Sequence, residues 1–280
     1  MSLLIALLLA QVGPAVTSNP QPVSALPPEL RDRPKPRAAA KDAAAPAEPG
    51  ELEACLGLEN PVDAVDAAND WLTRAKGTER ATAGECLGVA LSRLERWDEA
   101  AQAFAAARGA ADTAPWRARL GAMTGEAALN AGDAQAALDA LDKAKADAGG
   151  DTVMQGGLAL FRARALVALK RDAAAAEALA DARRLAPDSA QAWLLSATLS
   201  RRQGKLAEAQ QQIERAFDLR PVDLQIGLEA GVIAVLSGRD DAARKSWQSV
   251  IAAAPDSAEA TVARGYIAQL DPAAPAETGR

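Results

Sequence analysis

Three prolines recur at a fixed interval in the C-terminal half of the chain, because Pro187, Pro221 and Pro255 are each 34 residues apart. Small residues keep the same period in two columns, which are Ala175, Ala209 and Ala243 in one and Ala163, Ala197, Gly231 and Gly265 in the other. A 34-residue unit of two short helices cannot bury its apolar face alone, so such units stack into an array. The period therefore predicts a repeat protein that presents a long inner surface.

The composition favours helices and excludes several classes of function. Alanine makes up about a quarter of the chain and aromatic residues 3%, which favours closely packed helices over sheets. The net charge of -6 is opposite to the basic face of nucleic-acid binders. Histidine is absent, so the commonest metal ligand and the commonest general base at neutral pH are missing. No metalloprotease, nucleophile-elbow, P-loop or dinucleotide motif is present either. We expect no catalytic site, no metal and no cofactor.

The N-terminus is expected to be an export signal followed by a tether. Residues 1–18 begin with the apolar run MSLLIALLLA and continue into small and polar residues, which is typical of a secretory signal peptide. The run is too short to span a bilayer, which requires about 20 apolar residues. Because it lacks Lys and Arg, an apolar N-terminus without targeting function, or a misplaced start codon, is the alternative. The protein is then periplasmic or secreted, and cytoplasmic under the alternative.

The remaining chain divides by composition into three parts. Residues 19–50 contain eight prolines and few large apolar residues, which predicts a disordered tether. Residues 51–271 carry apolar residues at helical spacing, interrupted by Gly, Pro and Asp, and form the predicted helical domain. Residues 272–280 are expected to be a disordered tail.

The segment Ala190–Asp223 shows the repeat most clearly. Its markers, along two helices and the turn between them, are Trp193, Ala197, Gly204, Ala209, Ile213, Ala216 and Pro221. This order resembles tetratricopeptide repeats (TPR) of exported bacterial proteins, and the resemblance covers about residues 80–270. It implies an all-α fold, an α-solenoid of stacked helix-turn-helix units in a right-handed superhelix. About five units are clear, and residues 259–270 resemble the start of another unit that acts as a cap.

Two earlier units match the pattern with longer steps. The distances from Gly88 to Gly125 and from Gly125 to Ala163 are 37 and 38 residues. We expect the extra residues in the loops around 109–114 and 148–151.

The two cysteines, Cys55 and Cys86, lie 31 residues apart near the start of the array. If residues 51–58 and 61–75 form a degenerate unit, its first helix lies beside that of the next unit and the cysteines face each other. A disulfide closing this loop would stabilise the fold by about 3 to 4 kcal/mol. An export signal and an even cysteine count favour a disulfide. Two buried thiols in a cytosolic protein are the alternative.

The resemblance also implies a binding surface, since the first helices of TPR units line the concave face. The residues expected to point into this groove are Arg93, Glu126, Asn130, Arg164, Arg201, Arg202, Leu228, Val232 and Val235. They form a basic, polar stretch followed by an apolar one, which suits a peptide with acidic and apolar residues. Glu85 and Val89 stand where the carboxylate clamp of heat-shock co-chaperones needs basic and amide side chains, so that clamp is not reproduced.

Three hypotheses for function follow. The first is a non-catalytic periplasmic scaffold that binds a protein or peptide partner in the groove. The second is a structural accessory of a cell-envelope complex that acts through its outer surface or its tether, with an empty groove. The third, an enzyme or regulator with the array as a module, has no candidate residue. The sequence does not identify the partner.

Overall fold

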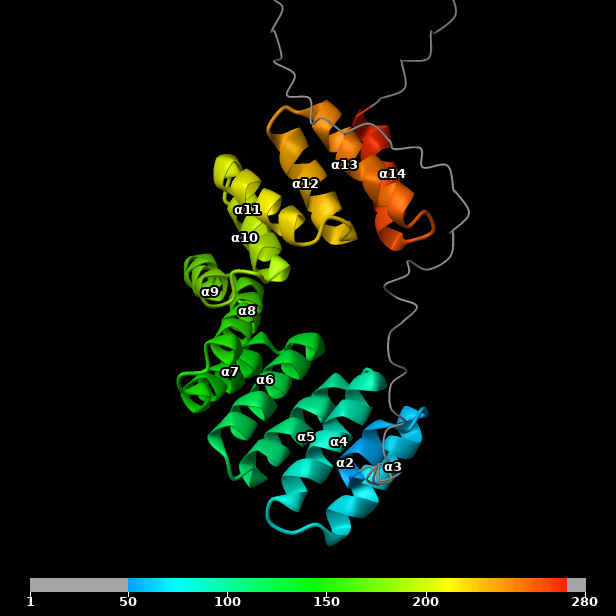
Figure 1. The fold of residues 1–280 in the computed structure, drawn as a ribbon, viewed down its shortest axis with the longest axis vertical. Helices are drawn as coiled ribbons and strands as arrows, with labels where there is room; N and C mark the ends of the chain where they lie inside the picture. Colours follow the sequence, from blue (N-terminus) through cyan, green and yellow to red (C-terminus); the bar gives the residue numbers. More distant parts are fainter. Residues whose placement is uncertain (1–49, 271–280) are drawn as a thin grey trace, which may run out of the picture. The chain divides into compact units, whose positions relative to one another are not determined.

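The computed structural model describes residues 50–270, which form thirteen helices and no strand (Figure 1). The helices are α2 (Glu51–Leu56), α3 (Pro61–Arg74), α4 (Glu79–Arg93), α5 (Trp97–Ala110), α6 (Ala114–Ala131), α7 (Ala134–Ala148), α8 (Thr152–Ala168), α9 (Asp172–Leu185), α10 (Ala190–Arg202), α11 (Leu206–Leu219), α12 (Leu224–Leu236), α13 (Asp240–Ala253) and α14 (Ala258–Leu270). The predicted signal and nearly all of the tether and tail lie outside the described residues. No helix in residues 50–270 is both long and apolar enough to cross a membrane.

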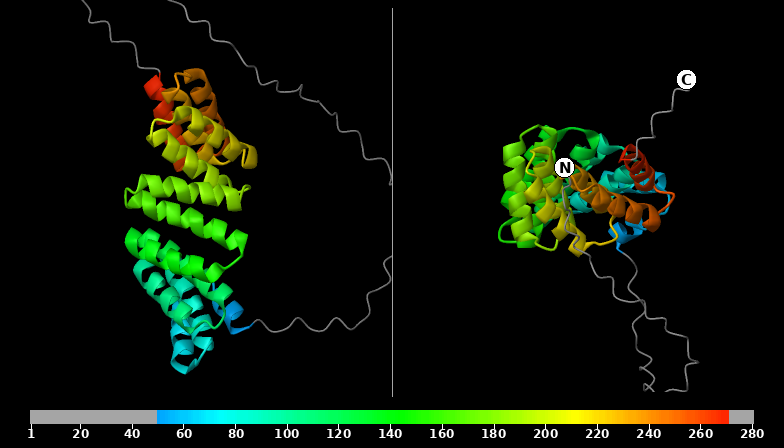
Figure 2. Two further views of the ribbon diagram at one scale, coloured as in Figure 1. Left: turned by 90° about the vertical axis from the view of Figure 1, so that its left-hand side faces the viewer. Right: turned by 90° about the horizontal axis from the view of Figure 1, so that it is seen from above.

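Ten of these helices form five consecutive pairs, from α4 and α5 to α12 and α13. Each second helix also packs against the first helix of the next unit, so the pairs stack in chain order (Figures 1 and 2). The last helix, α14, packs against α13 and α12 at the end of the stack. This arrangement confirms the expected α-solenoid with five units and a C-terminal helix.

The extra residues of the early units lengthen helices and not loops, so the expected loop insertions are wrong. The connections before α6 and α8 are residues 111–113 and 149–151, shorter than the four-residue connections before α10 and α12. Instead, α6 and α8 contain 18 and 17 residues, whereas α10 contains 13. A proline in the first turn of α6 and the N-cap of Asp151 before α8 start these helices about one turn early.

A left-handed residue ends the first helix of every unit. It is Glu95, Gly132, Lys170, Gly204 and Gly238 in the five units, with φ between 57° and 87°. Glycine adopts this conformation without steric cost, whereas a residue with a Cβ does not. The turns at Glu95 and Lys170 therefore hold a conformation that their residue types disfavour.

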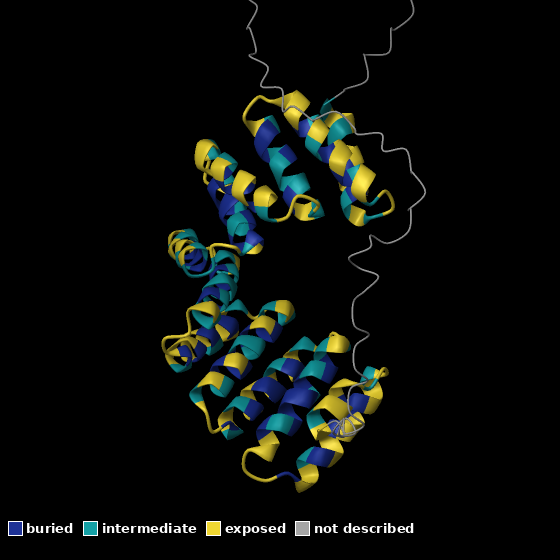
Figure 3. Cartoon of the chain, in the orientation of Figure 1, coloured by how far each residue is buried: buried dark blue, intermediate teal, exposed yellow. Residues whose placement is uncertain are grey.

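Each unit is closed by a contact between a small residue on the first helix and a large one 16 positions later on the second. The five pairs are Gly88 with Phe104, Gly125 with Leu141, Ala163 with Leu179, Ala197 with Ile213, and Gly231 with Trp247. All ten residues are buried. Figure 3 shows buried segments, in dark blue, on helices along the whole stack. A Cβ on Gly88, Gly125 or Gly231 would overlap the opposing side chain. These three positions are therefore glycine because the opposing Phe, Leu or Trp side chain leaves no room for a methyl group.

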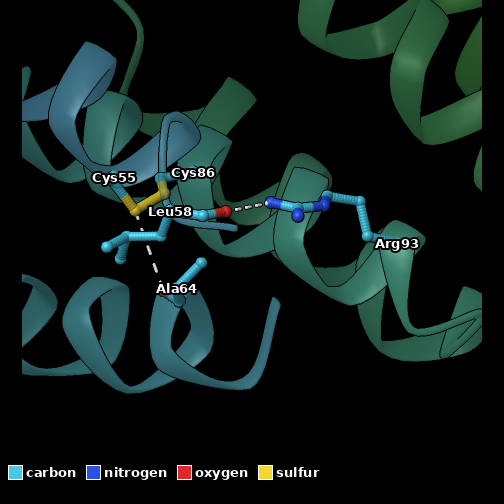
Figure 4. The surroundings of a disulfide bond; sticks show 5 residues. All are labelled: Cys55, Leu58, Ala64, Cys86 and Arg93. Carbon is cyan, nitrogen blue, oxygen red and sulfur yellow. Dashed lines mark hydrogen bonds between the residues drawn. A yellow bond between two sulfur atoms is a disulfide. The ribbon is translucent and has the colours of Figure 1, made fainter. Parts of the chain in front are cut away.

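A disulfide fixes the N-terminal end of the array, as expected. Cys55 on α2 is bonded to Cys86 on α4, with the two Cα atoms 6.3 Å apart (Figure 4). Both cysteines are buried, and α2 lies against α4. The short helix α2 buries only Cys55 of its six residues, so this covalent link adds to the packing of Leu52 and the ion pair of Glu51 with Arg74.

Candidate functional site

All nine predicted groove residues lie on the first helices of their units, on α4, α6, α8, α10 and α12. The structure places them in four local groups along the array. It separates them into two hollows, one internal ion pair and one half-buried apolar patch. Each group has a different capacity to bind a ligand.

The first hollow, here called the α4–α6 hollow, brings together three of the predicted residues. Its volume is about 350 Å³, and its lining residues are Val89, Ser92, Arg93, Trp97, Phe104, Met123, Glu126, Ala127 and Asn130. Aromatic and aliphatic side chains form most of the lining, and polar groups of both signs supplement them. This composition is typical of a site that buries an apolar side chain and orients it by a few polar contacts.

The planar guanidinium group of Arg93 carries several N–H donors and binds two backbone carbonyl groups beside that hollow. Its Nη1 donates to the carbonyl of Leu58 at 2.7 Å (Figure 4). Its Nη2 donates to the carbonyl of Glu59. Both acceptors follow α2, the helix that carries the disulfide. The segment that the disulfide joins to α4 therefore positions Arg93, a charged side chain of the α4–α6 hollow.

The second hollow, here called the α8–α10 hollow, holds two more predicted residues. Its volume is about 160 Å³, and its lining residues are Ala163, Arg164, Val167, Leu179, Leu195, Thr198, Leu199 and Arg202. Arg164 lies 5.6 Å from the ring centroid of Phe161. Within residues 50–270, neither arginine forms an ion pair with a carboxylate. Two uncompensated positive charges thus flank an apolar depression.

Arg201 differs from its neighbour, because its charge is already neutralised within the array. Its Nε lies 2.6 Å from Oε1 of Glu229 and its Nη2 lies 3.3 Å from Oε2, and both side chains are largely buried. The pair joins α10 to α12 and so stabilises the stack. Arg201 was predicted as a groove residue, and in the structure its positive charge is paired with the carboxylate of Glu229.

The predicted apolar part of the groove is partly covered. Leu228, Val232 and Val235 are half-buried and pack on a cluster that includes residues of α13 and α14. In that cluster the rings of Trp247 and Tyr266 lie with centroids 5.1 Å apart. The sequence predicted that these three residues point into the groove, and in the structure they also pack on a cluster that α13 and α14 share.

Glu85 is a buried carboxylate whose partners sequence reasoning did not identify. Only 3% of its surface is exposed, and Arg119 and Trp116 on α6 both donate to it. Arg119 Nη2 lies 2.8 Å and Trp116 Nε1 lies 3.0 Å from Glu85 Oε2. Glu85 therefore links two first helices, and its charge is not available to a ligand. The separation of Glu85 and Arg119 is 34 residues and differs from the 37-residue step between these two units, so the repeat did not indicate this pair.

Three titrating groups are perturbed by their surroundings, and none lines either hollow. A side-chain hydrogen bond lowers the pKa of Glu99 and raises that of Arg96, on the exposed surface of α5. Burial lowers the pKa of Arg183, which lies 5.2 Å from the ring centroid of Trp193.

Comparison with known proteins gives one consistent result. No protein-family model and no curated protein matches the chain. Among solved structures, Pseudomonas aeruginosa PilF is 17% identical with a TM-score of 0.61, over 77% of this chain and 96% of its own. A thermophilic TPR protein of Thermus thermophilus is 22% identical with a TM-score of 0.55, over 68% and 97%. YrrB, a TPR protein with an unusual peptide-binding site, is 19% identical with a TM-score of 0.50, over 72% and 99%.

These structural similarities show the fold, and they do not identify a ligand. The five helix pairs, their packing columns and the similar solved structures agree. The chain has the tetratricopeptide-repeat fold.

Proposed function

We propose that this protein is a non-catalytic scaffold that binds a polypeptide partner along the first helices of its array. The observation that carries the proposal is the α8–α10 hollow, where Arg164 and Arg202 border an apolar depression without a carboxylate partner in residues 50–270. The α4–α6 hollow supplies a second position on the same series of helices. The peptide-binding site of YrrB, a protein with the same fold, supports this type of function.

The partner's chemistry follows from the two hollows. Arginine side chains bind carboxylates through paired, charge-assisted hydrogen bonds. Leu179, Leu195 and Leu199 offer an apolar floor of a size that suits one aliphatic side chain. A segment with acidic residues next to Leu, Ile or Met therefore fits the α8–α10 hollow.

The location that we propose is the periplasm or the outside of the cell. The signal-like residues 1–18 support export. The bonded pair of Cys55 and Cys86 supports it independently, because disulfides persist in oxidising compartments.

Affinity capture from an envelope extract, followed by mass spectrometry, tests the proposed function. The informative variant is the double charge reversal Arg164→Glu and Arg202→Glu in the full chain. Arg215→Glu is the matched control, because Arg215 is an exposed arginine on a second helix. We expect a partner captured by the wild type and the control to be lost from the double variant.

Two other results would count against binding of the partner in the hollows along the first helices. Equal capture by all three proteins would show that the inner hollows are not the site. Loss of the partner only when residues 19–49 are deleted would favour the tether and the structural-accessory hypothesis.

A further inference from the structure

The carbonyl groups of the three periodic prolines differ in what they bind. The carbonyl of Pro187 accepts a hydrogen bond from Trp193 Nε1 at 2.9 Å, and that of Pro255 accepts one from Arg264 Nη2 at 2.5 Å. Among residues 50–270, no donor reaches the carbonyl of Pro221. These two donors lie six and nine residues after their prolines, and the residues at those distances from Pro221 are Gly227 and Ala230, which have no side-chain donor.

These small residues leave a hollow between the end of α11, the start of α12 and the end of α13. Figure 1 shows that these three helices follow one another in the C-terminal part of the array. Trp193 and Leu219 of one unit correspond, 34 residues later, to Gly227 and Ala253. Both small residues line this hollow, which has a volume of about 250 Å³. Ligand pockets for small molecules usually exceed about 300 Å³, so this one suits a single large side chain.

The lining of this hollow repeats the surroundings of the Trp193 indole. That indole lies beside Arg183 and donates to Pro187, and the residues 34 positions later are Phe217 and Pro221. Both of these line the hollow. Phe217 is 48% exposed, although a phenyl ring is apolar. The hollow thus occupies the position that the indole takes one unit earlier.

We propose that this hollow binds a tryptophan side chain of a partner protein, flanked in that partner by carboxylates. The indole would lie against Phe217 and Val250 and donate its N–H to the carbonyl of Pro221. Two charged residues line the hollow, and one of them, Asp223, already accepts from the backbone N–H groups of Gln225 and Ile226. The carboxylates are inferred from the other, Lys245, which is exposed and forms no ion pair with a carboxylate in residues 50–270. Buried aromatic side chains with one polar group are frequent at protein interfaces.

The occupant is a different protein and not this chain. None of its five tryptophans is exposed, and residues 1–49 and 271–280 contain no aromatic residue. A second copy or a terminal segment therefore has no indole to offer. The site is also independent of the groove, because it shares no residue with the α4–α6 or the α8–α10 hollow.

A titration of the isotope-labelled full chain with the pentapeptide Ac-Glu-Asp-Trp-Asp-Glu-NH2, followed by amide chemical shifts, tests this proposal. We expect saturable shifts at Gly227, Ser249 and Ala253, with a dissociation constant on the order of 1 mM. Replacing the peptide's Trp by Ala should abolish the shifts. Replacing its acids by Gln and Asn should weaken binding about threefold to fivefold.

Variants locate the site on the protein. Ala253→Leu fills the hollow as Leu219 fills the preceding unit, and should weaken binding about tenfold or more. Its matched control is Ala252→Leu, since Ala252 is exposed and does not line the hollow. Lys245→Glu should weaken binding about threefold or more, whereas Lys143→Glu on α7 should leave it unchanged. Unchanged circular dichroism would show that these exposed substitutions preserve the fold.

Several results would overturn the proposal. These are an absence of saturable shifts in the wild type, equal binding of the peptide without Trp, or equal binding by Ala253→Leu and the wild type. Shifts at the same amides on concentrating the protein alone would assign the hollow to a second copy. Shifts on deleting residues 1–49 would assign it to the chain's own N-terminal segment.

Discussion

The N-terminal and C-terminal parts of the array build the same fold with different contacts. In the N-terminal part, a disulfide joins α2 to α4, and Glu85 is bound by two side chains of α6. Asp147 there pairs with both Arg108 and Arg117. In the C-terminal part, the units follow one 34-residue period without insertions. The C-terminal part also has a link between units, the ion pair of Arg201 with Glu229. The difference is therefore one of degree, because the part with the longer first helices adds a disulfide and further ion pairs to the repeated packing.

The largest effect is expected from removing the disulfide. The double substitution Cys55→Ala and Cys86→Ala should reduce the stability of the N-terminal part by about 3 to 4 kcal/mol in the chain-entropy model. Because each repeat contacts only its neighbours, amides of α2 to α4 should exchange faster and those of α12 to α14 should not. Hydrogen exchange with mass spectrometry measures both regions at once, and equal acceleration in the two would show that the array unfolds as one unit.

The next largest effect is expected from changing a small residue that packs between the two helices of a unit in the C-terminal part. Ala197 is fully buried opposite Ile213, so Ala197→Leu should overpack the helix pair and lower the free energy of unfolding by about 1 to 3 kcal/mol. Adding Ile213→Ala should restore part of the loss, because the two side chains share one space. Ala207→Leu, at an exposed position of α11, is the control. A thermal melt of Ala197→Leu that matches the wild type would contradict the register of the repeat.

A smaller loss is expected from the ionic link of the N-terminal part. Arg119→Ala leaves the buried carboxylate of Glu85 with Trp116 alone and should cost about 1 to 2 kcal/mol. Arg74→Ala breaks an exposed pair with Glu51 and should change stability by less than about 1 kcal/mol. Chemical denaturation of the two variants checks this order, and the opposite order would show that Glu85 does not need its arginine.

The smallest effect has the opposite sign. Glu95→Gly and Lys170→Gly should each stabilise the protein by about 0.5 to 1 kcal/mol, since both residues are left-handed with φ near 57°. Gly204→Ala, at the equivalent turn of the fourth unit, should destabilise it by a similar amount. Denaturation midpoints measure these differences, and a loss of stability in both glycine variants would mean that the two side chains make contacts worth more than the strain.

The sequence predicted the architecture because residues at equivalent positions of a repeat make equivalent packing contacts. Gly231 and Trp247 face each other for the reason that Ala197 and Ile213 do, so one well-defined unit determined the others. The expected insertions failed because a helix can start one turn early as easily as a loop can lengthen, as Pro115 shows in α6.

The candidate site was less predictable, because its charges are paired between units. Arg201 and Arg202 are neighbours in the sequence, yet Glu229 neutralises one and leaves the other free of an ion pair in the described part of the chain. The cover that α14 provides for Val232 and Val235 depends on where the array ends. Both features arise from contacts between units that differ from one unit to the next, so the residues that recur in every unit do not predict them.

The most direct test of the scaffold proposal is a peptide selection on the full chain followed by titration. A displayed random library should yield peptides in which carboxylates flank Leu, Ile or Met, and the recovered peptides are then titrated against wild type, Arg164→Glu with Arg202→Glu, and Arg215→Glu. We predict that the dissociation constant rises about tenfold or more in the double variant and is unchanged in the Arg215→Glu control. Equal affinity for all three proteins, or selected peptides without carboxylates, would contradict binding along the first helices.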